Sequence, residues 1–297
     1  MEQRYLKIME LSEILDLSVR LYRKNFIPLV LAQVPLTLTV FFVLMRGGGT
    51  GFFDVFNQTP SYTGNLDNYF ITMLLSFVQS ILVYPLVLGA VTKVASDCIL
   101  QESPSVKKAY KFALHNKGKL IVTSVVISFA IGLVVGIFIS APLALIIFGM
   151  RAPGSSTGAL VLVLFALLFT GIGVVIASFL WIRWVTTFPV LVNEEDEDLG
   201  TFDAMKRSWN LVQGHTRKLF FVMVAVSLIP TLVQLSPSAM GLFAGRFLAI
   251  LTVVFGVVAQ GLISPLVDCT RVVIYFELKT RKEGFDLEKR VEQLQEV

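Results

Sequence analysis

Thr201 to Leu219 reads TFDAMKRSWNLVQGHTRKL, a charged amphipathic segment that runs directly into a long apolar stretch. A similar order occurs at Leu11 to Leu29, LSEILDLSVRLYRKNFIPL, where Ser18 aligns with Ser208. A weaker copy, SVKKAYKFALHNKGKLIV, begins at Ser105, close to midway between the other two. Recurrence of one unit at regular intervals is typical of chains built from structural repeats. The sequence therefore predicts three repeats of one membrane unit, over residues 1–100, 101–198 and 199–297.

The composition is that of an integral membrane protein. Of the 297 residues, 55% are hydrophobic and 15% are charged, and the mean hydropathy is +0.75. A soluble chain carries about 25% charged residues, and a membrane span needs roughly 20 apolar ones. The net charge of +4 fits Lys and Arg concentrated in cytoplasmic loops. No basic stretch is interleaved with aromatics as in nucleic-acid readers, so we expect no nucleic acid among the partners.

Six apolar runs are long enough to cross a bilayer, which predicts an all-α, polytopic membrane protein formed by a single domain over residues 1–297. The expected spans are residues 26–45, 70–92, 120–150, 159–192, 219–235 and 247–276. Each repeat would then be an amphipathic helix followed by a transmembrane hairpin. Pro85 is expected to kink the second span. At about 1.5 Å per residue the fourth run would reach roughly 50 Å, so it must tilt, break or emerge from the bilayer.

The leader before the first span, residues 1–25, has helical periodicity. Apolar and small residues recur on one side and charged residues on the other; the first set is Leu11, Ile14, Leu15 and Ser18. Such a helix can lie in the headgroup plane with its apolar face turned to the acyl chains. A solvated N-terminal helix is the alternative.

Basic residues assign the orientation. Nearly all Lys and Arg fall in the two termini and in the segments that follow the second and fourth spans. Each of the three other connecting segments holds a single arginine: Arg46, Arg151 and Arg246. Because basic residues are enriched in cytoplasmic loops, we expect a multi-pass protein of the cell membrane with both termini in the cytoplasm.

Few ionisable or amide side chains fall within the spans, and these are the default functional candidates of a membrane protein. They are Arg183, Asp268, Arg271, Gln260 and Gln79. Asp268 and Arg271 lie about one helical turn apart and are spaced to pair. A pair between Arg183 and Asp268 is a second hypothesis, based on their similar depth. The alternative for both arginines is that their side chains reach the cytoplasmic headgroups.

A second group of candidates comprises basic residues of the amphipathic segments, which would contact anionic lipid headgroups. These residues are Lys206, Arg207, Arg217, Lys218, Arg20, Arg23 and Lys24. A Lys or Arg near an anionic membrane surface contributes about 1 kcal/mol. Membrane lipids are therefore the expected partners, with a partner membrane protein as a further possibility.

No catalytic, metal or cofactor site is predicted. The acidic run at residues 194–198 could attract a divalent cation. Five consecutive carboxylates on a linker do not converge on one point, however, so a solvated linker is the better interpretation. The phosphate-binding, nucleophile-elbow and zinc-protease motifs are absent from the sequence.

Three segments resemble a known family in the order in which it carries them. DAMKRSWNLVQGHTRKLF at Asp203 to Phe220 and YFELKTRKEGFDLE at Tyr275 to Glu288 are similar to the membrane domain of glycerophosphoryl diester phosphodiesterase and its stand-alone relatives. The N-terminal LSEILDLSVRLYRKNF is similar to the opening of that family. In the fused enzymes catalysis belongs to a separate TIM-barrel domain, whose His-Arg dipeptide and acidic ligand cluster are absent here. The resemblance implies a membrane module without phosphodiesterase activity.

Two functions stay open. The first is a non-enzymatic membrane protein that organises lipids or partner proteins at the cytoplasmic leaflet. The alternative is a transporter or channel for a small or lipid-like substrate, with Arg183, Asp268 and Gln260 lining the path. A membrane-embedded enzyme is disfavoured because no set of residues has the spacing of a catalytic site.

Overall fold

A computed structural model of the chain describes residues 8–46, 66–151, 156–194, 199–241 and 246–284. Within these ranges every regular element is a helix. The first third contains α1 (Leu11–Lys24), α2 (Phe26–Arg46), α4 (Leu66–Val78), the π-helix η1 (Gln79–Val83) and α5 (Tyr84–Ile99). The middle third contains α6 (Val106–His115), α7 (Lys117–Arg151), α8 (Ser156–Arg183) and α9 (Thr187–Asn193). The last third contains α10 (Thr201–Val212), α11 (Thr216–Gly241) and α12 (Arg246–Glu283).

Six of the described helical stretches are long and apolar enough to cross a membrane. They are Phe26–Leu44, Phe70–Ile99, Lys117–Ser140, Val161–Asn193, Thr216–Val233 and Val254–Glu283. This confirms the prediction of an all-α, polytopic membrane protein with six spans. A short amphipathic helix precedes two long stretches in each third of the chain. That order is what three repeats require, while a shared arrangement of the three units in space stays a prediction.

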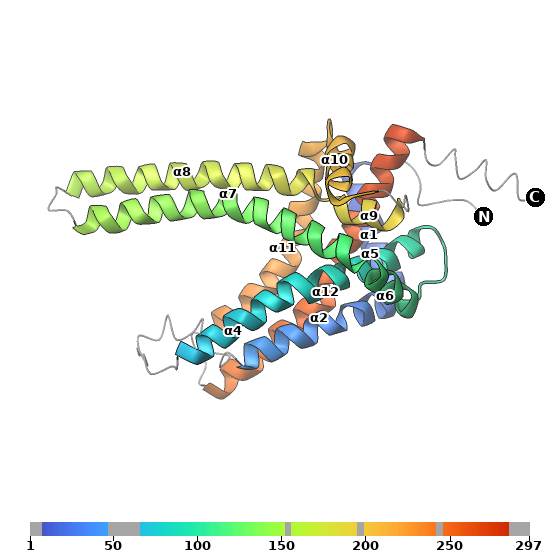
Figure 1. The fold of residues 1–297 in the computed structure, drawn as a ribbon, viewed down its shortest axis with the longest axis horizontal. Helices are drawn as coiled ribbons and strands as arrows, with labels where there is room; N and C mark the ends of the chain where they lie inside the picture. The colour runs from blue at the N-terminus through green and yellow to red at the C-terminus, as the bar shows by residue number, and fades with distance from the viewer. Residues whose placement is uncertain (1–7, 47–65, 152–155, 195–198, 242–245, 285–297) are drawn as a thin grey trace, which may run out of the picture.

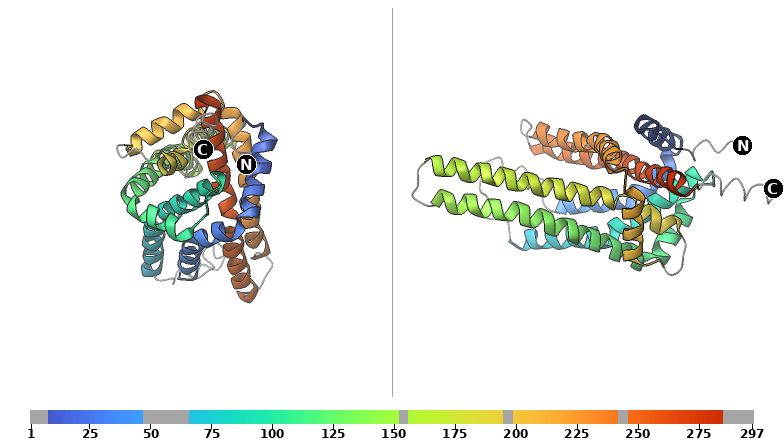
Figure 2. Two further views of the ribbon diagram at one scale, coloured as in Figure 1. Left: turned by 90° about the vertical axis from the view of Figure 1, so that its right-hand side faces the viewer. Right: turned by 90° about the horizontal axis from the view of Figure 1, so that it is seen from above.

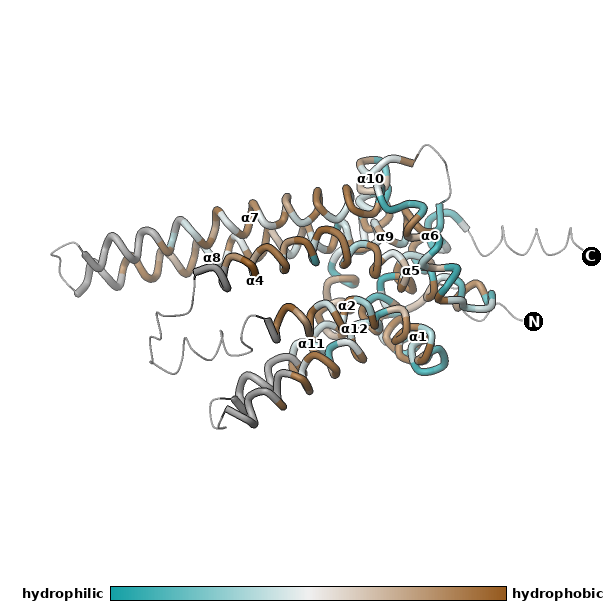
Figure 3. The backbone as a smooth tube through the Cα atoms, turned by 60° about the horizontal axis from the view of Figure 1, so that its bottom comes forward, coloured by the Kyte–Doolittle hydropathy of each residue, from teal (hydrophilic) through white to brown (hydrophobic). Residues whose placement is uncertain are grey.

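The short helices α1, α6, α9 and α10 gather at one end of the molecule, which we call the polar end (Figure 1). The long helices run away from it. Among them, α7 and α8 pair as a hairpin that diverges from α2, α4, α11 and α12 (Figure 1). Hydrophilic residues concentrate at the polar end and hydrophobic residues along the long helices (Figure 3). This separation is the one that a bilayer and its headgroup layer impose.

The core of the polar end is built around the last part of α12. There α12 passes between the N-terminal α1 and the middle segments of the chain (Figure 2). Residues 272–278, with the sequence VVIYFEL, are all at most 2% exposed. Earlier in α12, a Cβ at Gly261 would lie 2.2 Å from Thr37 Oγ1 of α2. Only glycine allows so close an approach of two helices, as is typical of membrane helix packing.

The second span contains a π-helical turn. The backbone N–H of Tyr84 donates to the carbonyl of Gln79, five residues earlier. Pro85 follows directly and has no N–H to continue the α-helical ladder. Single π-helical turns inside α-helices accommodate such interruptions. The distortion predicted at Pro85 therefore takes the form of a widened turn before the proline.

The fourth apolar run breaks, which is one of the three outcomes that the sequence allowed. Its first helix, α8, ends at Arg183, and α9 begins at Thr187 after a turn. The break lets α9 pack against α5 and α10 at the polar end. A run too long for one bilayer crossing is thereby divided into a long span and a short buried helix.

The apolar face of α1 packs against protein. Ile14, Leu17 and Leu21 are buried where α1 meets α11 and α12. Ser18 is also buried and donates from Oγ to the carbonyl of Ile14 over 2.7 Å. The sequence predicted a face turned to acyl chains; the structure turns it inward, because the buried part of α12 presents apolar surface beside it.

A short break separates each amphipathic helix from the long helix that follows. At the first two breaks an asparagine closes the short helix: Asn25 Nδ2 donates to the carbonyl of Leu21 over 3.1 Å, and Asn116 Nδ2 donates to that of Phe112 over 3.3 Å. The third break uses Gly214, whose φ of 93° is readily adopted by glycine. The three breaks set α1, α6 and α10 across the polar end.

Candidate functional site at the polar end

A first polar cluster joins α9, α10 and α12 around Glu194. Arg207 of α10 pairs with Glu194 over 3.1 Å and with Glu283 of α12 over 2.6 Å. Tyr275 Oη donates to Glu194 Oε1 over 3.0 Å. Burial of Arg207 lowers its pKa, but the hydrogen bonds from its guanidinium to Glu194 and Glu283 outweigh that effect and raise the pKa above the ordinary arginine value. This arginine is a fixed positive charge that holds two acidic residues from distant parts of the chain.

A second polar cluster joins α1, α11 and α12 around Glu277. The Glu277 side chain is 0% exposed and pairs with Lys218 over 3.0 Å. Arg281, one turn further along α12, pairs with the same carboxylate. Lys218 and Arg281 both also donate to the backbone carbonyl of Met9, ahead of α1. A buried carboxylate is tolerated only with such partners, so this cluster fixes the start of α1 against α11 and α12.

The intramembrane candidates fall into separate places. Asp268 and Arg271 form the predicted pair, with 2.8 Å between Oδ1 and NH1. The hypothetical pair between Arg183 and Asp268 is not formed, because Asp268 takes its partner from its own helix and Arg183 lies at the end of α8. Gln260 lies two turns before Asp268 on α12, and its buried Oε1 has no partner among the described residues. Gln79 is half-buried in η1.

Arg183 has an aromatic environment. Its guanidinium lies 5.0 Å from the ring centre of Phe179 and 4.7 Å from that of Trp209. NH1 donates to the carbonyl of Trp209 over 3.4 Å, and the buried Nε has no hydrogen-bond partner among the described residues. The Arg183 carbonyl accepts from Ser208 over 2.9 Å, and Ser208 shares a 2.8 Å hydrogen bond with Thr186. Within the described part of the chain, Arg183 is thus held by cation–π contacts and by no carboxylate.

The predicted headgroup contacts divide into two groups. Arg207 and Lys218 are committed to the ion pairs of the two clusters. The other members are exposed: Lys206, Arg217, Arg20, Arg23 and Lys24. Arg20 also pairs with Asp16 on its own helix, over 2.6 Å. Sequence reasoning missed the acidic centres Glu194 and Glu277, although their position beside basic amphipathic segments was a signal that partners were available.

An apolar groove lies outside both polar clusters. It follows one face of α8, has a volume of about 630 Å³, and is open to the side. Its lining residues are Leu164, Leu167, Leu168, Gly171, Ile172, Val175 and Ile176. A Cβ at Gly171 would meet no atom within 4 Å, so the glycine deepens the groove.

The chain was compared with known protein families, curated proteins and solved structures. The family model described as 'Protein of unknown function (DUF975)' matches residues 20–282. The chain belongs to the DUF975 family. No curated protein and no solved structure matches the chain significantly. The match does not link this DUF975 member to the membrane domain of glycerophosphoryl diester phosphodiesterase, so no property of that family is carried over.

The described residues offer no recognisable catalytic arrangement. No group of three or more His, Cys, Asp or Glu side chains among them could hold a metal ion. The two cysteines, Cys98 and Cys269, are buried free thiols. What the polar end does provide is a set of internal ion pairs that leaves exposed cations around it.

Proposed function

We propose that this DUF975 protein is a non-enzymatic membrane protein that organises anionic lipids at the cytoplasmic leaflet, with both termini in the cytoplasm. The observation that carries the proposal is the distribution of charge at the polar end. Three carboxylates there, those of Glu194, Glu277 and Glu283, pair with basic residues of other helices. Exposed lysines and arginines stand around them on α1, α6, α10 and α11. The surface that faces the headgroup layer is therefore cationic.

The clearest part of this surface is α6. Lys107, Lys108 and Lys111 are exposed, while Ala109 and Ala113 on the other side of the helix are buried. Tyr110 anchors the helix, because its Oη donates to the carbonyl of Ala32 in α2 over 2.6 Å. Burial raises the pKa of Tyr110 to about 12, so it stays a neutral donor. The lysines are presented on a helix that is fixed to the rest of the protein.

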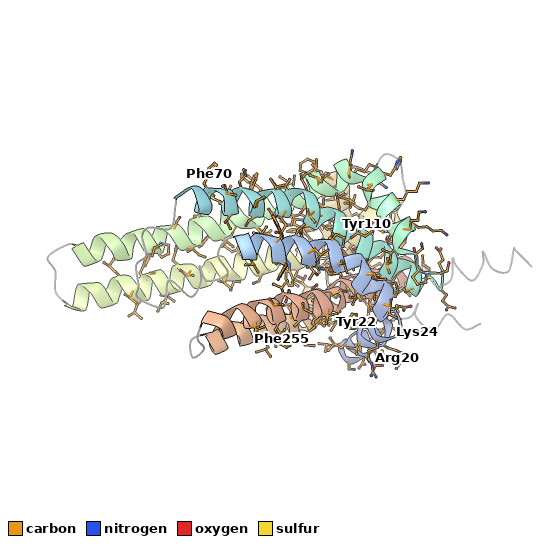
Figure 4. All side chains as sticks on the ribbon, turned by 90° about the horizontal axis from the view of Figure 1, so that it is seen from below. Arg20, Tyr22, Lys24, Phe70, Tyr110 and Phe255 are labelled. Atoms are coloured by element: carbon orange, nitrogen blue, oxygen red, sulfur yellow. The ribbon has the colours of Figure 1, made fainter. Side chains whose placement is uncertain are left out.

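Basic and apolar side chains alternate on the remaining short helices. Arg20 and Lys24 project from the polar end, whereas Phe70 and Phe255 project along the apolar part (Figure 4). On α10 the exposed Phe202 lies one turn before the exposed Lys206. Such a mixture suits the boundary between headgroups and acyl chains. Lipid headgroups supply the anionic charge that complements it.

The test is the lipid selectivity of the full-length protein reconstituted into phosphatidylcholine bilayers that contain some phosphatidylglycerol. Spin-labelled versions of the two lipids report which one is enriched around the protein. We expect enrichment of phosphatidylglycerol that weakens when salt is raised from about 0.1 M to about 1 M, since the Debye length falls from about 10 Å to about 3 Å. Replacement of Lys107, Lys108 and Lys111 together by glutamine should remove much of it.

The matched control replaces the same three lysines by arginine, which keeps the charge and should keep the selectivity. Equal affinity of the wild-type protein for both lipids would refute the proposal. Movement of a solute across the vesicle wall that depends on Gln260 or Asp268 would instead favour a transporter. Labelling of cysteines introduced at the two termini, applied from either side of the membrane, tests the orientation.

A further inference from the structure

We propose that the apolar groove of α8 and Arg183 together form a binding site for one anionic phospholipid, with an acyl chain along the groove and the phosphate at the guanidinium. This inference rests on the proposed function and deepens it. The basic surface would attract anionic lipids collectively, whereas this site would hold a single molecule in a defined position.

The lining of the groove is suited to the hydrocarbon chain of a lipid. Its lining residues recur at helical spacing along one face of α8, and all of them are apolar or glycine. Leu168 and Val175 are 70% and 69% exposed, so this face is not covered by protein among the described residues. The lining includes Gly171, where an added Cβ would meet no neighbouring atom within 4 Å. An elongated apolar chain fits such a surface, and a polar ligand would find almost no hydrogen-bonding group there.

The same face of α8 leads to Arg183. From Ile172 and Ile176 of the lining, Phe179 and Arg183 follow at intervals of three and four residues, which keeps these four positions on one side of the helix. At about 1.5 Å per residue, Gly171 and Arg183 are separated by roughly 18 Å along the axis. Half of the hydrocarbon layer is roughly 15 Å thick. A chain that starts at Arg183 would therefore meet the near end of the groove at Ile176, about 10 Å away, within one leaflet and would reach Gly171 close to the bilayer midplane.

Arg183 supplies the complementary charge. Its only described acceptor is the carbonyl of Trp209, at 3.4 Å, and among the described residues it has no carboxylate partner. Arg207 differs, because two carboxylates neutralise it. The planar guanidinium suits a phosphate, which it can bind through two parallel hydrogen bonds. The rings of Phe179 and Trp209 hold the cation in place beside the apolar surface.

These two features together identify the occupant. A second transmembrane helix would cover the groove but would leave the cation without an anion. A soluble phosphate would neutralise the cation but would leave the groove to other lipids. An anionic phospholipid satisfies both, because its hydrocarbon and its charge are joined at one end.

The experiment is native mass spectrometry of the full-length protein extracted from bilayers of equal parts phosphatidylglycerol and phosphatidylcholine. We expect the wild-type protein to retain one phosphatidylglycerol. Gly171→Leu fills the hollow and Arg183→Gln removes the charge, and each should lower this retention about tenfold, as expected for the loss of a charged hydrogen bond or its equivalent. Arg183→Lys should retain an intermediate amount, because an ammonium cannot bind phosphate through a planar fork.

The matched control is Gly132→Leu, on a face of α7 where a Cβ also meets no atom within 4 Å. It should retain the lipid as the wild-type protein does. Equal retention by Gly171→Leu and the wild type, or equal loss in Gly132→Leu, would overturn the site. Displacement of the lipid by inorganic phosphate alone would also overturn it, since the acyl chain is required.

Failure of the general proposal would look different. If anionic lipids are not organised at all, the wild-type protein shows no preference for phosphatidylglycerol in either experiment. If only the α8 site is wrong, the preference in bilayers persists and depends on the α6 lysines, while Gly171→Leu and Arg183→Gln bind lipid as the wild type does.

Discussion

The last part of α12 and the middle of α8 are both apolar helical segments of long spans, yet they have opposite surroundings. In the span from Val254 to Glu283, an 18-residue window has a mean hydropathy of 1.5, and 44% of its residues are buried inside the protein. The corresponding window of the span from Val161 to Asn193 has a mean hydropathy of 2.7, and 17% of its residues are buried. The less hydrophobic helix is the more buried one. In a membrane the lipid is as apolar as any core, so the protein interior is where polar groups find partners.

The arginines at the two places show the same contrast. Arg207 of α10, which contacts the end of α12, is neutralised by Glu194 and Glu283. Arg183, at the end of α8, has aromatic neighbours and, among the described residues, a single backbone acceptor. Around the end of α12 the arginine is paired within the protein, in what we call the closed region; at the end of α8, the open region, Arg183 has no carboxylate partner among the described residues.

The strongest test of this contrast is the removal of a charge from the closed region. Glu277→Ala would leave Lys218 and Arg281 facing each other without their shared carboxylate. We expect a loss of about 3 kcal/mol in the free energy of unfolding, at the low end for a broken buried pair. The loss is at the low end because Lys218 and Arg281 keep 23% and 27% of their side chains exposed. Thermal unfolding in detergent measures it.

Arg183→Ala is the matched variant in the open region. It removes contacts with two rings but leaves no buried carboxylate behind, so its cost should be about 1 kcal/mol. Equal destabilisation by the two variants would contradict the contrast between the regions.

The second test compares two glycines on the same helix. A Cβ at Gly173 would lie 2.2 Å from Cβ of Phe138 on α7, whereas a Cβ at Gly171 meets nothing. Gly173→Ala should therefore separate the α7–α8 hairpin and cost about 2 kcal/mol of stability, as overpacking does. Gly171→Ala should be neutral or slightly stabilising because alanine favours the helix. A cross-link between cysteines placed in α7 and α8 would report the separation, and its unchanged yield in Gly173→Ala would count against a close contact between the two helices at this glycine.

The sequence predicts contacts between residues that lie close together along the chain better than contacts between distant segments. The spans and the Asp268–Arg271 pair follow from runs and spacings within one segment, and both are present. The contacts of Lys218 with the Glu277 carboxylate and with the Met9 carbonyl join three distant segments, and no periodicity encodes them. Hydropathy predicts which helices enter a membrane, but it does not separate a lipid-facing surface from a protein-facing one. The inward turn of α1 was missed for that reason.

The third test uses Ser18 and Ser208, which align in the first and third repeats. Ser208 bonds outside its own helix, to the Arg183 carbonyl and to Thr186. The hydroxyl of Ser18 bonds within its own helix, to the carbonyl of Ile14, and to no other group among the described residues. Ser208→Ala should cost about 1 kcal/mol because it leaves buried polar groups without a partner. Ser18→Ala should cost almost nothing, since its backbone acceptor already belongs to the helix and alanine favours a helix.

Chemical unfolding of the two alanine variants side by side is the measurement. If they are equally destabilised, the two repeats use their aligned serines alike, and the difference between the polar-end contacts of α1 and α10 is without energetic consequence.

The smallest expected effect is a pH dependence at His215, beside the Glu277 cluster. Burial and then the charge of Arg281 lower the pKa of His215 from 6.5, with Lys218 and Lys282 acting in the same direction and Glu277 against it. The imidazole also has a buried Nδ1 without a hydrogen-bond partner among the described residues. Below about pH 6.5 the unfolded chain therefore binds more protons at this position than the folded protein does.

Stability that depends on a neutral His215 is present above its unfolded pKa and is lost as the pH falls below it. Lowering the pH from about 7.5 to about 5.5 should thus reduce the Tm of the wild-type protein more than that of His215→Gln, which cannot titrate. The difference should be smaller than the effect of any substitution above, because the ring is only partly buried. A wild-type Tm that rises on acidification relative to the variant would mean that Glu277 outweighs the three cations. The cluster would then have spare negative charge, and the closed region would be less completely neutralised than its geometry indicates.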